Sequence, residues 1–436
     1  MIINRRSVLK KNISMGVALK AISIFLTYLL VPIVLKYLGT EKYGIWVTIF
    51  SVMSWVYTFD VGVGNGLKLR LTEALSKKDV VKAKEYIITA YLIITAISFF
   101  LLFMGFYGIY NLDFTKYLNS EVLSNTVIRK VIFIAFIFTL SNFVINLYKQ
   151  LFAATHRVAY SDLTNAIYLF LVLISLLTIR HYFDSSIIIL ALVYGLSNII
   201  VGVIFTVIFF SGRKELIPSF RNFKLSRVKD VISVGVEFLI IQLAVLIIFT
   251  TDNIIISRYL GPADVTPYNV VSQYFQAIIL CWYIISAPLT PLYTEAFIKN
   301  DKIWICKTIK KLNYLFCVII IGVIIAILAG SYIIDFWVGK ELIYPKYLFF
   351  LFGVFVLIRI YGDLYMSFLN GIGKLRLQMY ISIFGAAINI PLSIFFIKHF
   401  NLGSSGVILA TNLSLVLLAI LMPIQTYKIL KEKRNE

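Results

Sequence analysis

The chain has 436 residues, of which 60% are hydrophobic and 14% are charged, with a mean hydropathy of +0.90 and a formal net charge of +20. Soluble domains carry about 25% charged residues because their surface must be solvated, so this composition excludes a soluble globular protein and indicates an integral membrane protein. A large positive charge suggests nucleic acid as the partner of a soluble protein, but in a membrane protein it is expected first in the cytoplasmic loops.

The apolar residues form long, unbroken runs rather than short alternating ones. A membrane-spanning helix needs about 20 mostly apolar residues, whereas a barrel strand shows about 10 residues of alternating polarity. We therefore predict an all-α, polytopic membrane protein with about twelve transmembrane helices. The predicted segments are 13–35, 43–66, 86–110, 129–153, 160–180, 185–211, 233–257, 265–292, 311–337, 346–370, 377–398 and 404–427.

The loops between these segments predict the orientation of the chain. The first segment follows a basic start, with Arg5 and Arg6, and is too long for the core of a signal peptide, so we expect it to be retained as a helix. The chain has 41 Lys and Arg residues. The loops on the side of the N-terminus carry roughly three times as many of them as the loops on the other side, which predicts that both termini are cytoplasmic. The same bias explains the net charge and leaves no basic face for nucleic acid.

Two polar octapeptides suggest an internal repeat. Residues 72–79 read TEALSKKD, residues 294–301 read TEAFIKND, and their starts are 222 positions apart. The sequence Tyr-Leu-Gly at 37–39 recurs at 259–261 with the same offset. Because repeated sequence indicates repeated structure, we predict two six-helix lobes, 1–211 and 233–436, joined by a basic cytoplasmic linker, 212–232. An even number of helices in each lobe implies parallel repeats, and the transport path is expected between the lobes.

Charged residues within apolar segments are costly, and usually face a cavity or a partner. Asp60 and Asp252 lie in the second and seventh segments, and Lys20 lies in the first. Arg359 and Asp363 are four residues apart in the tenth segment, so they share a helix face. Each also has a structural interpretation: an internal ion pair for Arg359 and Asp363, a hydrogen-bonded carboxylate for Asp60, a solvated helix end for Asp252, and a side chain that reaches the interface for Lys20.

Uncharged polar residues in the same segments either join helices or line a wet cavity. Asn65, Gln273 and Gln276 are the candidates for the substrate pathway, and the two glutamines are three residues apart on one helix face. The glycine-rich stretch 62–66 continues an apolar segment and follows no strand, so we expect close helix packing or a hinge rather than nucleotide binding. Isolated histidines and three scattered cysteines predict no metal site and no disulfide framework.

Three stretches resemble a known family. Residues 38–46, LGTEKYGIW, resemble the start of the second helix in bacterial polysaccharide flippases, and 59–67, FDVGVGNGL, resemble its end. Residues 251–257, TDNIIIS, followed by Leu-Gly at 260–261, resemble the end of the seventh helix. With the predicted topology, the likeness covers nearly the whole chain. The family is that of the O-antigen and capsule repeat-unit flippases, in the multidrug/oligosaccharidyl-lipid/polysaccharide exporter superfamily.

The resemblance implies a function. Members of this family move an undecaprenyl-pyrophosphate-linked oligosaccharide from the inner to the outer leaflet of the bacterial cytoplasmic membrane by alternating access between two lobes. The implied partners are this lipid-linked substrate, the bilayer and other membrane proteins of polysaccharide assembly, with no enzymatic activity and no cofactor. We hypothesise that Arg359, with Lys20, attracts the pyrophosphate or acidic sugars, and that Asp60 or Asp252 binds a coupling H⁺ or Na⁺.

Two other classes stay open. A cation-coupled multidrug exporter shares the superfamily, but the first segment lacks the carboxylate typical of that branch and has Lys20 in its place. A membrane-embedded polymerase or acyltransferase is the enzymatic alternative. A polymerase of this kind is expected to have a large charged outer loop, and the longest predicted outer loop here is the short 111–128.

Overall fold

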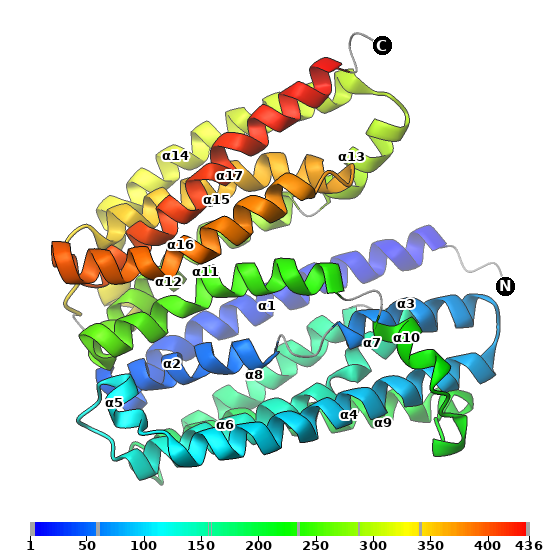
Figure 1. Ribbon diagram of the computed structural model, residues 1–436, viewed down its shortest axis with the longest axis horizontal. Coiled ribbons are helices and arrows are strands. Elements are labelled where there is room, and N and C mark those ends of the chain that lie inside the picture. The colour runs from blue at the N-terminus through cyan, green and yellow to red at the C-terminus, as the bar shows by residue number, and fades with distance from the viewer. Residues whose placement is uncertain are drawn as a thin grey trace. The chain divides into compact units, whose positions relative to one another are not determined.

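The computed structural model describes residues 5–57, 62–155, 157, 159–232, 236–286, 288–339 and 342–432. These residues form α-helices joined by turns and short 3₁₀ helices, with no strand in the described ranges, so the predicted all-α class is confirmed. The chain divides into two compact units, Met1–Gln242 and Leu243–Glu436. Each unit is a bundle of long helices (Figure 1).

In the first unit, α1 packs against α8, and α6 packs against both α4 and α9. Two short 3₁₀ helices and α10 follow α9 along the chain. The bounds are α1 Arg5–Leu38, α2 Thr40–Tyr57, α3 Val63–Ser76, α4 Val80–Asn111, α5 Phe114–Leu118, α6 Asn125–Ile145, α7 Leu147–Ala154, α8 Ala159–Ile179, α9 Ile187–Ser211, η2 Lys214–Leu216, η3 Phe220–Asn222 and α10 Ser226–Ile232.

In the second unit, α17 packs along both α15 and α16, and α12 packs on α15. The boundary between the units falls inside α11. The bounds are α11 Val236–Leu260, α12 Pro262–Ser286, α13 Leu289–Ile298, α14 Lys302–Val338, α15 Leu348–Gly371, α16 Arg376–Phe400 and α17 Ser404–Glu432.

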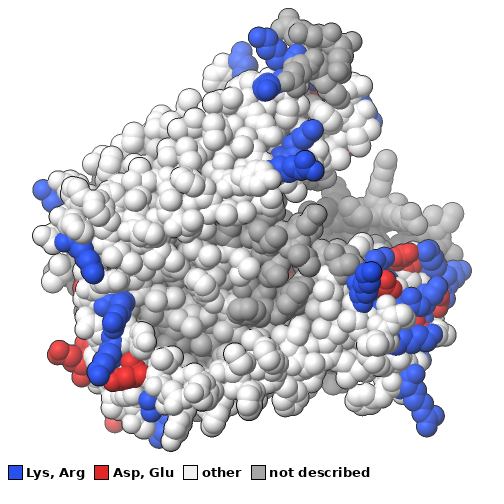
Figure 2. All heavy atoms as spheres, viewed as in Figure 1, with Lys and Arg blue, Asp and Glu red and all other residues white. Residues whose placement is uncertain are grey.

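Ten helical stretches among the described residues are long and apolar enough to cross a membrane: α1, α4, α6 with α7, α8, α9, α12, α14, α15, α16 and α17. The other two predicted segments, 43–66 and 233–257, contain residues outside the described ranges, and α2 and α11 occupy their described parts. On the face drawn in Figure 2, charged side chains gather toward the ends of the helices and leave a broad uncharged surface between them. Such a surface suits contact with hydrocarbon.

Three predicted segments are not single helices. The segment 43–66 contains the end of α2 and the start of α3, whose N-cap Gly62 has a left-handed backbone with φ of +70°. The segment 129–153 is divided between α6 and α7, and 265–292 between α12 and α13. The prediction of continuous helices was wrong here because an apolar run records burial in the membrane and not the continuity of the backbone.

The two octapeptides fold alike. The second residue from the end of each, Lys78 or Asn300, has a positive φ, +57° and +56° respectively. In each, the final aspartate caps the next helix: Asp79 accepts a hydrogen bond from the backbone of Lys82 at 3.0 Å, and Asp301 accepts one from Trp304 at 2.9 Å. An N-cap carboxylate satisfies a backbone N–H that the helix leaves unpaired.

Side-chain pairs are repeated as well. The hydrogen bond from Lys77 to Glu73 at 2.8 Å recurs as Lys299 to Glu295 at 2.5 Å. Each lysine lowers the pKa of its glutamate from the ordinary value. Because both pairs follow the offset of 222 positions, the octapeptides are corresponding turns, which we call elbows, of a duplicated structure.

Each elbow also donates a hydrogen bond to the backbone of a helix that is distant in the sequence. Thr72 at the first elbow donates to the carbonyl of Ala154 at 3.4 Å, and Thr294 at the second donates to the carbonyl of Gly371 at 2.7 Å. Ala154 ends α7 and Gly371 ends α15, which are equivalent positions in the two units. The duplication therefore extends to contacts between segments, and not only to the sequence of the turns.

The segment predicted as a linker, 212–232, packs on the first unit. Its helix α10 contacts α3 and α4, as Figure 1 shows for α3. Glu85 of α4 is 2% exposed and accepts hydrogen bonds from Lys224 at 2.5 Å and Arg227 at 2.8 Å. At Gly66, a Cβ atom would lie 1.9 Å from the backbone oxygen of Val231. The glycine-rich stretch thus permits the close packing that the sequence predicted, and the partner is α10.

Candidate functional site

The predicted pathway residues fall in both units. Lys20 and Asn65 belong to the first unit, and Asp60 lies outside the described residues. The other five belong to the second unit: Asp252, Gln273, Gln276, Arg359 and Asp363. The candidates of the second unit lie on α11, α12 and α15, with Asp252 in one group of contacts and Arg359 and Asp363 in another.

Asp252 of α11 is buried, with 6% of its surface exposed. Its Oδ2 atom accepts a hydrogen bond from the hydroxyl of Tyr268 on α12 and lies 3.4 Å from Oγ1 of Thr411 on α17. Its Oδ1 atom is buried without a hydrogen-bond partner. A buried carboxylate with one unpartnered oxygen can accept a proton or contribute one ligand to a small cation.

Further hydrogen bonds extend this cluster to α16. Asn389 is fully buried, donates to Oγ1 of Thr411 at 3.1 Å, and has its Oδ1 atom 3.4 Å from the hydroxyl of Thr251. Four helices thus meet at a buried polar network built around Asp252. Because polar groups hidden from water are costly unless they are hydrogen-bonded, this network fixes how α11, α12, α16 and α17 pack.

Arg359 and Asp363 of α15 each have a partner on α12. The guanidinium of Arg359 donates to the hydroxyl of Tyr283 at 2.9 Å, and the carboxylate of Asp363 accepts from the indole N–H of Trp282 at 2.6 Å. Trp282 is buried, whereas both charged side chains are half-buried. The shared face predicted from the spacing is therefore the face that meets α12, and two adjacent aromatic residues there hold the opposite charges.

The remaining predicted residues lie closer to the surface. Gln273 of α12 is half-buried and donates to Asn269, one turn earlier, at 2.8 Å, while Gln276 is exposed. In the first unit, Lys20 is exposed and attracts the Asp162 carboxylate of α8. Asn65 is exposed on α3, where its side chain accepts a hydrogen bond from Lys68 at 3.5 Å. Both side chains are thus at the surface of the first unit.

A partly open cavity of about 140 Å³ lies in the first unit, between α2, α6, α8 and α9. Three of these helices contribute residues at helical spacing, so each presents one face to the cavity. Tyr168 is the contribution of α8. The residues from the other three helices are Trp46, Phe50, Met53 and Ser54 of α2, Ala135, Phe138, Thr139 and Asn142 of α6, and Ala191, Tyr194, Gly195 and Asn198 of α9.

Aromatic rings form one wall of this cavity. The ring centroids of Trp46 and Phe50 are 4.4 Å apart, and those of Trp46 and Tyr194 are 5.2 Å apart in an edge-to-face arrangement. Tyr168 extends the group, with its ring 6.4 Å from that of Tyr194. Gly195 lets the ring of Phe138 on α6 approach the backbone of α9: a Cβ atom at Gly195 would lie 2.1 Å from that ring.

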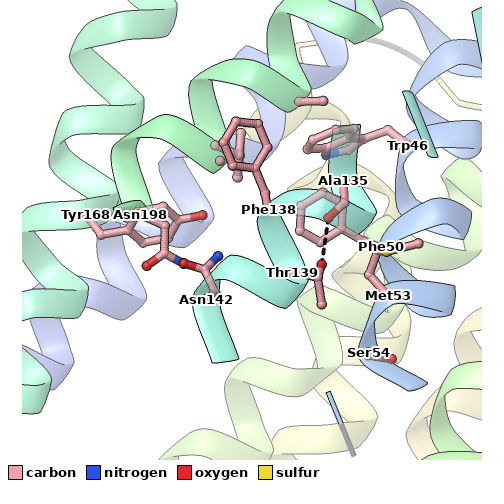
Figure 3. Close-up of a pocket in the computed structure, with 13 residues that line it drawn as sticks. Trp46, Phe50, Met53, Ser54, Ala135, Phe138, Thr139, Asn142, Tyr168 and Asn198 are labelled. Carbon is pink, nitrogen blue, oxygen red and sulfur yellow. Dashed lines mark hydrogen bonds between the residues drawn. The ribbon is translucent and has the colours of Figure 1, made fainter. Parts of the chain in front are cut away.

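Amide groups lie at the other end, where Figure 3 draws Asn142 and Asn198 beside Tyr168 and away from Trp46 and Phe50. Asn142 is 4% exposed, and its Oδ1 atom is buried without a hydrogen-bond partner. Thr139 also lines the cavity and donates to the backbone of Ala135 at 2.8 Å. Ligand-binding pockets typically have mostly apolar walls and a few polar groups, and this cavity has the same composition.

The residues of this cavity were not predicted from the sequence. The predicted pathway residues are charged side chains and three amides, Asn65, Gln273 and Gln276, and none of them lines the cavity. The signal was present as positions i, i+3, i+4 and i+7 in α6 and again in α9, with an asparagine at the last position of each. In the described part of the chain, no group of three or more His, Cys, Asp or Glu residues is placed to hold a metal ion.

Two family models match the chain. The family described as polysaccharide biosynthesis protein matches residues 9–297, well over half of the 436 residues. A second family, MatE, matches residues 238–395. The two matches overlap and together extend over both compact units.

Similar proteins cover nearly the whole chain. A Yersinia pseudotuberculosis protein named for O-antigen export is 24% identical, with 84% of this chain and 83% of that protein aligned. A Salmonella typhimurium protein named as an O-antigen transporter is 27% identical, with 96% and 94% aligned. Among solved structures, a multidrug resistance MATE family transporter of the MOP superfamily matches with a TM-score of 0.81 at 13% identity, covering 96% of this chain and 99% of that one. A MOP superfamily transporter from Pyrococcus furiosus matches with a TM-score of 0.67 at 14% identity, covering 97% and 96%. These structures confirm a two-lobed transporter fold.

Proposed function

The chain belongs to the polysaccharide biosynthesis protein family, and we propose that it moves an undecaprenyl-pyrophosphate-linked oligosaccharide from the inner to the outer leaflet of the bacterial cytoplasmic membrane by alternating access. The observation that supports this best is the likeness to proteins named for O-antigen transport, which extends over 84–96% of the chain. Sugars and pyrophosphate cannot cross hydrocarbon unaided, because their polar groups would lose their hydrogen bonds to water.

The structure offers polar groups of the kinds such a substrate needs, inside helices that are otherwise apolar. The second unit holds the half-buried guanidinium of Arg359, whose planar donors suit phosphate oxygens. The first unit holds a cavity with aromatic walls and amide groups. We further propose that both termini and both elbows lie on the cytoplasmic side, as the Lys and Arg distribution suggests.

Deleting the gene is expected to abolish the surface polysaccharide of the host and to leave lipid-linked oligosaccharide in the inner leaflet. The measurement is surface-polysaccharide staining together with extraction of the lipid-linked intermediate, before and after the gene is restored on a plasmid. A strain that keeps its surface polysaccharide after deletion would contradict the proposal. A deletion that changes only drug susceptibility would instead favour a multidrug exporter.

A coupling cation is proposed at Asp252. Replacing Asp252 with asparagine preserves the size of the side chain but removes the charge, so we expect gradient-driven transport in proteoliposomes to fall about tenfold or more, the loss of one charge-assisted interaction. Uptake is measured with a proton or a sodium gradient imposed, and Asp264→Asn, at the start of α12, is the matched control. If the wild-type protein transports equally well with no gradient of either ion, Asp252 has no coupling role.

A further inference from the structure

The cavity of the first unit has room for the core of one six-membered ring. Its volume of about 140 Å³ is close to that of an engineered protein cavity of about 150 Å³ that holds benzene. Because the cavity is partly open to the surface, the substituents of a sugar ring can extend through the opening. The rings of Trp46, Phe50 and Tyr194 contact one another at interplanar angles of 54°, 66° and 69°, so together they supply an apolar wall against which a single ring face can pack. A pyranose ring has an apolar C–H face of this kind and carries hydroxyl groups around its edge, so it needs an apolar wall and polar partners together.

The amide end of the cavity supplies those partners. Asn142 is 4% exposed, and its Oδ1 atom is buried without a partner. A buried acceptor of this kind normally has a hydrogen-bond donor. A sugar hydroxyl can donate to Oδ1 of Asn142 and at the same time accept a hydrogen bond from a neighbouring N–H, because a hydroxyl group does both. Asn198, at the same end of the cavity, offers a second amide.

The charge of the lining decides which sugars fit. All thirteen lining residues are described by the structure, and none of them is Lys, Arg, His, Asp or Glu. The carboxylate of an acidic sugar, or a pyrophosphate, would enter this cavity without a counter-charge and would lose its hydration. An uncharged ring loses only hydroxyl–water hydrogen bonds, which the amides and Tyr168 can replace.

We propose that the cavity bounded by α2, α6, α8 and α9 binds one uncharged hexopyranose ring of the transported oligosaccharide. The inference rests on the proposed function for the origin of the sugar, but the binding itself does not require transport. It assigns Asn142 the role of hydrogen-bonding the ring and Trp46, Phe50 and Tyr194 the role of packing against its apolar face. It also separates this cavity from the phosphate end of the substrate, which needs positive charge.

The test uses the full-length protein in nanodiscs made without glycolipid or sugar detergent. Saturation-transfer NMR is recorded with neutral methyl hexopyranosides, including N-acetylated ones, and with methyl glucuronoside as the acidic probe. We expect transfer to the ring protons of at least one neutral glycoside and at least tenfold weaker binding of the glucuronoside. Binding of no neutral glycoside, or equal binding of neutral and acidic probes, overturns the proposal.

Two variants locate the binding. Asn142→Leu is expected to reduce binding of the neutral glycoside at least tenfold, whereas the control Asn111→Leu, an exposed residue at the end of α4, leaves it unchanged. If Asn142→Leu does not fold, Phe50→Leu serves instead, because Phe50 is 41% exposed and its loss removes the aromatic ring while keeping apolar contact. Unchanged binding in the variant that folds shows that the sugar binds elsewhere, which overturns the proposal.

The outcome is distinct from that of the deletion experiment. If the deletion strain fails to lose surface polysaccharide but the neutral glycoside binds and depends on Asn142, the proposed function falls while the sugar site stands. If the deletion has its expected effect and no neutral glycoside binds, the sugar site falls while the function stands. Each proposal can therefore fail without the other.

Discussion

Replacing Gly66 with alanine is expected to detach α10 from the first unit and to destabilise that unit by about 3 kcal/mol, the upper part of the usual range for overpacking. A Cβ atom at this position would lie 1.9 Å from the carbonyl oxygen of Val231 and 2.8 Å from its carbonyl carbon. Both are backbone atoms, so no side-chain rotation can relieve the clash, and α3 and α10 must move apart.

Limited trypsin digestion of the purified protein measures this change. The segment 212–232 contains Lys214, Arg221 and Lys224, which are expected to be cut faster when α10 is released, and the melting temperature is expected to fall. Gly64→Ala is the matched control, because a Cβ atom there would meet only the flexible side chain of Gln150, at 3.3 Å. Equal digestion and equal melting of the two variants would show that the contact between Gly66 and Val231 does not hold the segment.

The segment 212–232, which was predicted as a linker, is attached to the first unit by several side chains. Lys224 and Arg227 both pair with Glu85, and the guanidinium of Arg227 also lies 5.3 Å from the ring centroid of Tyr86. Arg70 of α3 donates to the backbone oxygen of Asp230 at 3.2 Å. Lys224 and Arg227 therefore have structural partners on α4, and α3 binds the backbone of the same segment, so the segment is held on the first unit and is not a free tether.

Apolar length is a local property, and it could be predicted from the sequence. The segment predicted at 185–211 is α9, Ile187–Ser211, and the one predicted at 377–398 is α16, Arg376–Phe400. Backbone breaks inside apolar runs could not be predicted in the same way. The break between α6 and α7 falls at Asn146, with no glycine or proline to mark it, and hydrophobicity alone does not distinguish one helix from two in series.

Some features of the candidate site could likewise be predicted from the sequence, and others could not. The burial of Asp252 and the shared face of Arg359 and Asp363 follow from charge placed in an apolar helix, which the sequence shows directly. Their partners, such as Tyr268 for Asp252, come from other helices, and contacts between helices depend on how the chain folds back in space. Asn142 was missed because an uncharged side chain in an apolar segment is as often a contact between helices as a ligand-binding group.

Replacing Arg359 with alanine is expected to reduce transport of the lipid-linked substrate at least about tenfold, and up to about a hundredfold, the range for loss of a charge-assisted hydrogen bond. The side chain is half-buried in the middle of α15, and one of its N–H groups donates a hydrogen bond to the hydroxyl of Tyr283. A charge at this depth is costly to keep, and such charges usually lie on a substrate or ion path. The guanidinium offers several donors in one plane, a geometry that matches phosphate oxygens.

A lysine at position 359 distinguishes the effect of the positive charge from the effect of the planar guanidinium. Arg359→Lys keeps the positive charge but loses the planar fork, so transport is expected to recover only in part, to within about tenfold of the wild type. Tyr283→Phe removes the hydroxyl that holds the guanidinium and is expected to give a smaller loss of transport, with no change in charge.

The control is Arg376→Ala, which removes an exposed charge at the start of α16. Transport is measured by restoration of surface polysaccharide in the deletion strain, with protein abundance in the membrane determined in parallel. Full activity of both Arg359 variants at normal abundance would show that the guanidinium serves only to pack α15 against α12.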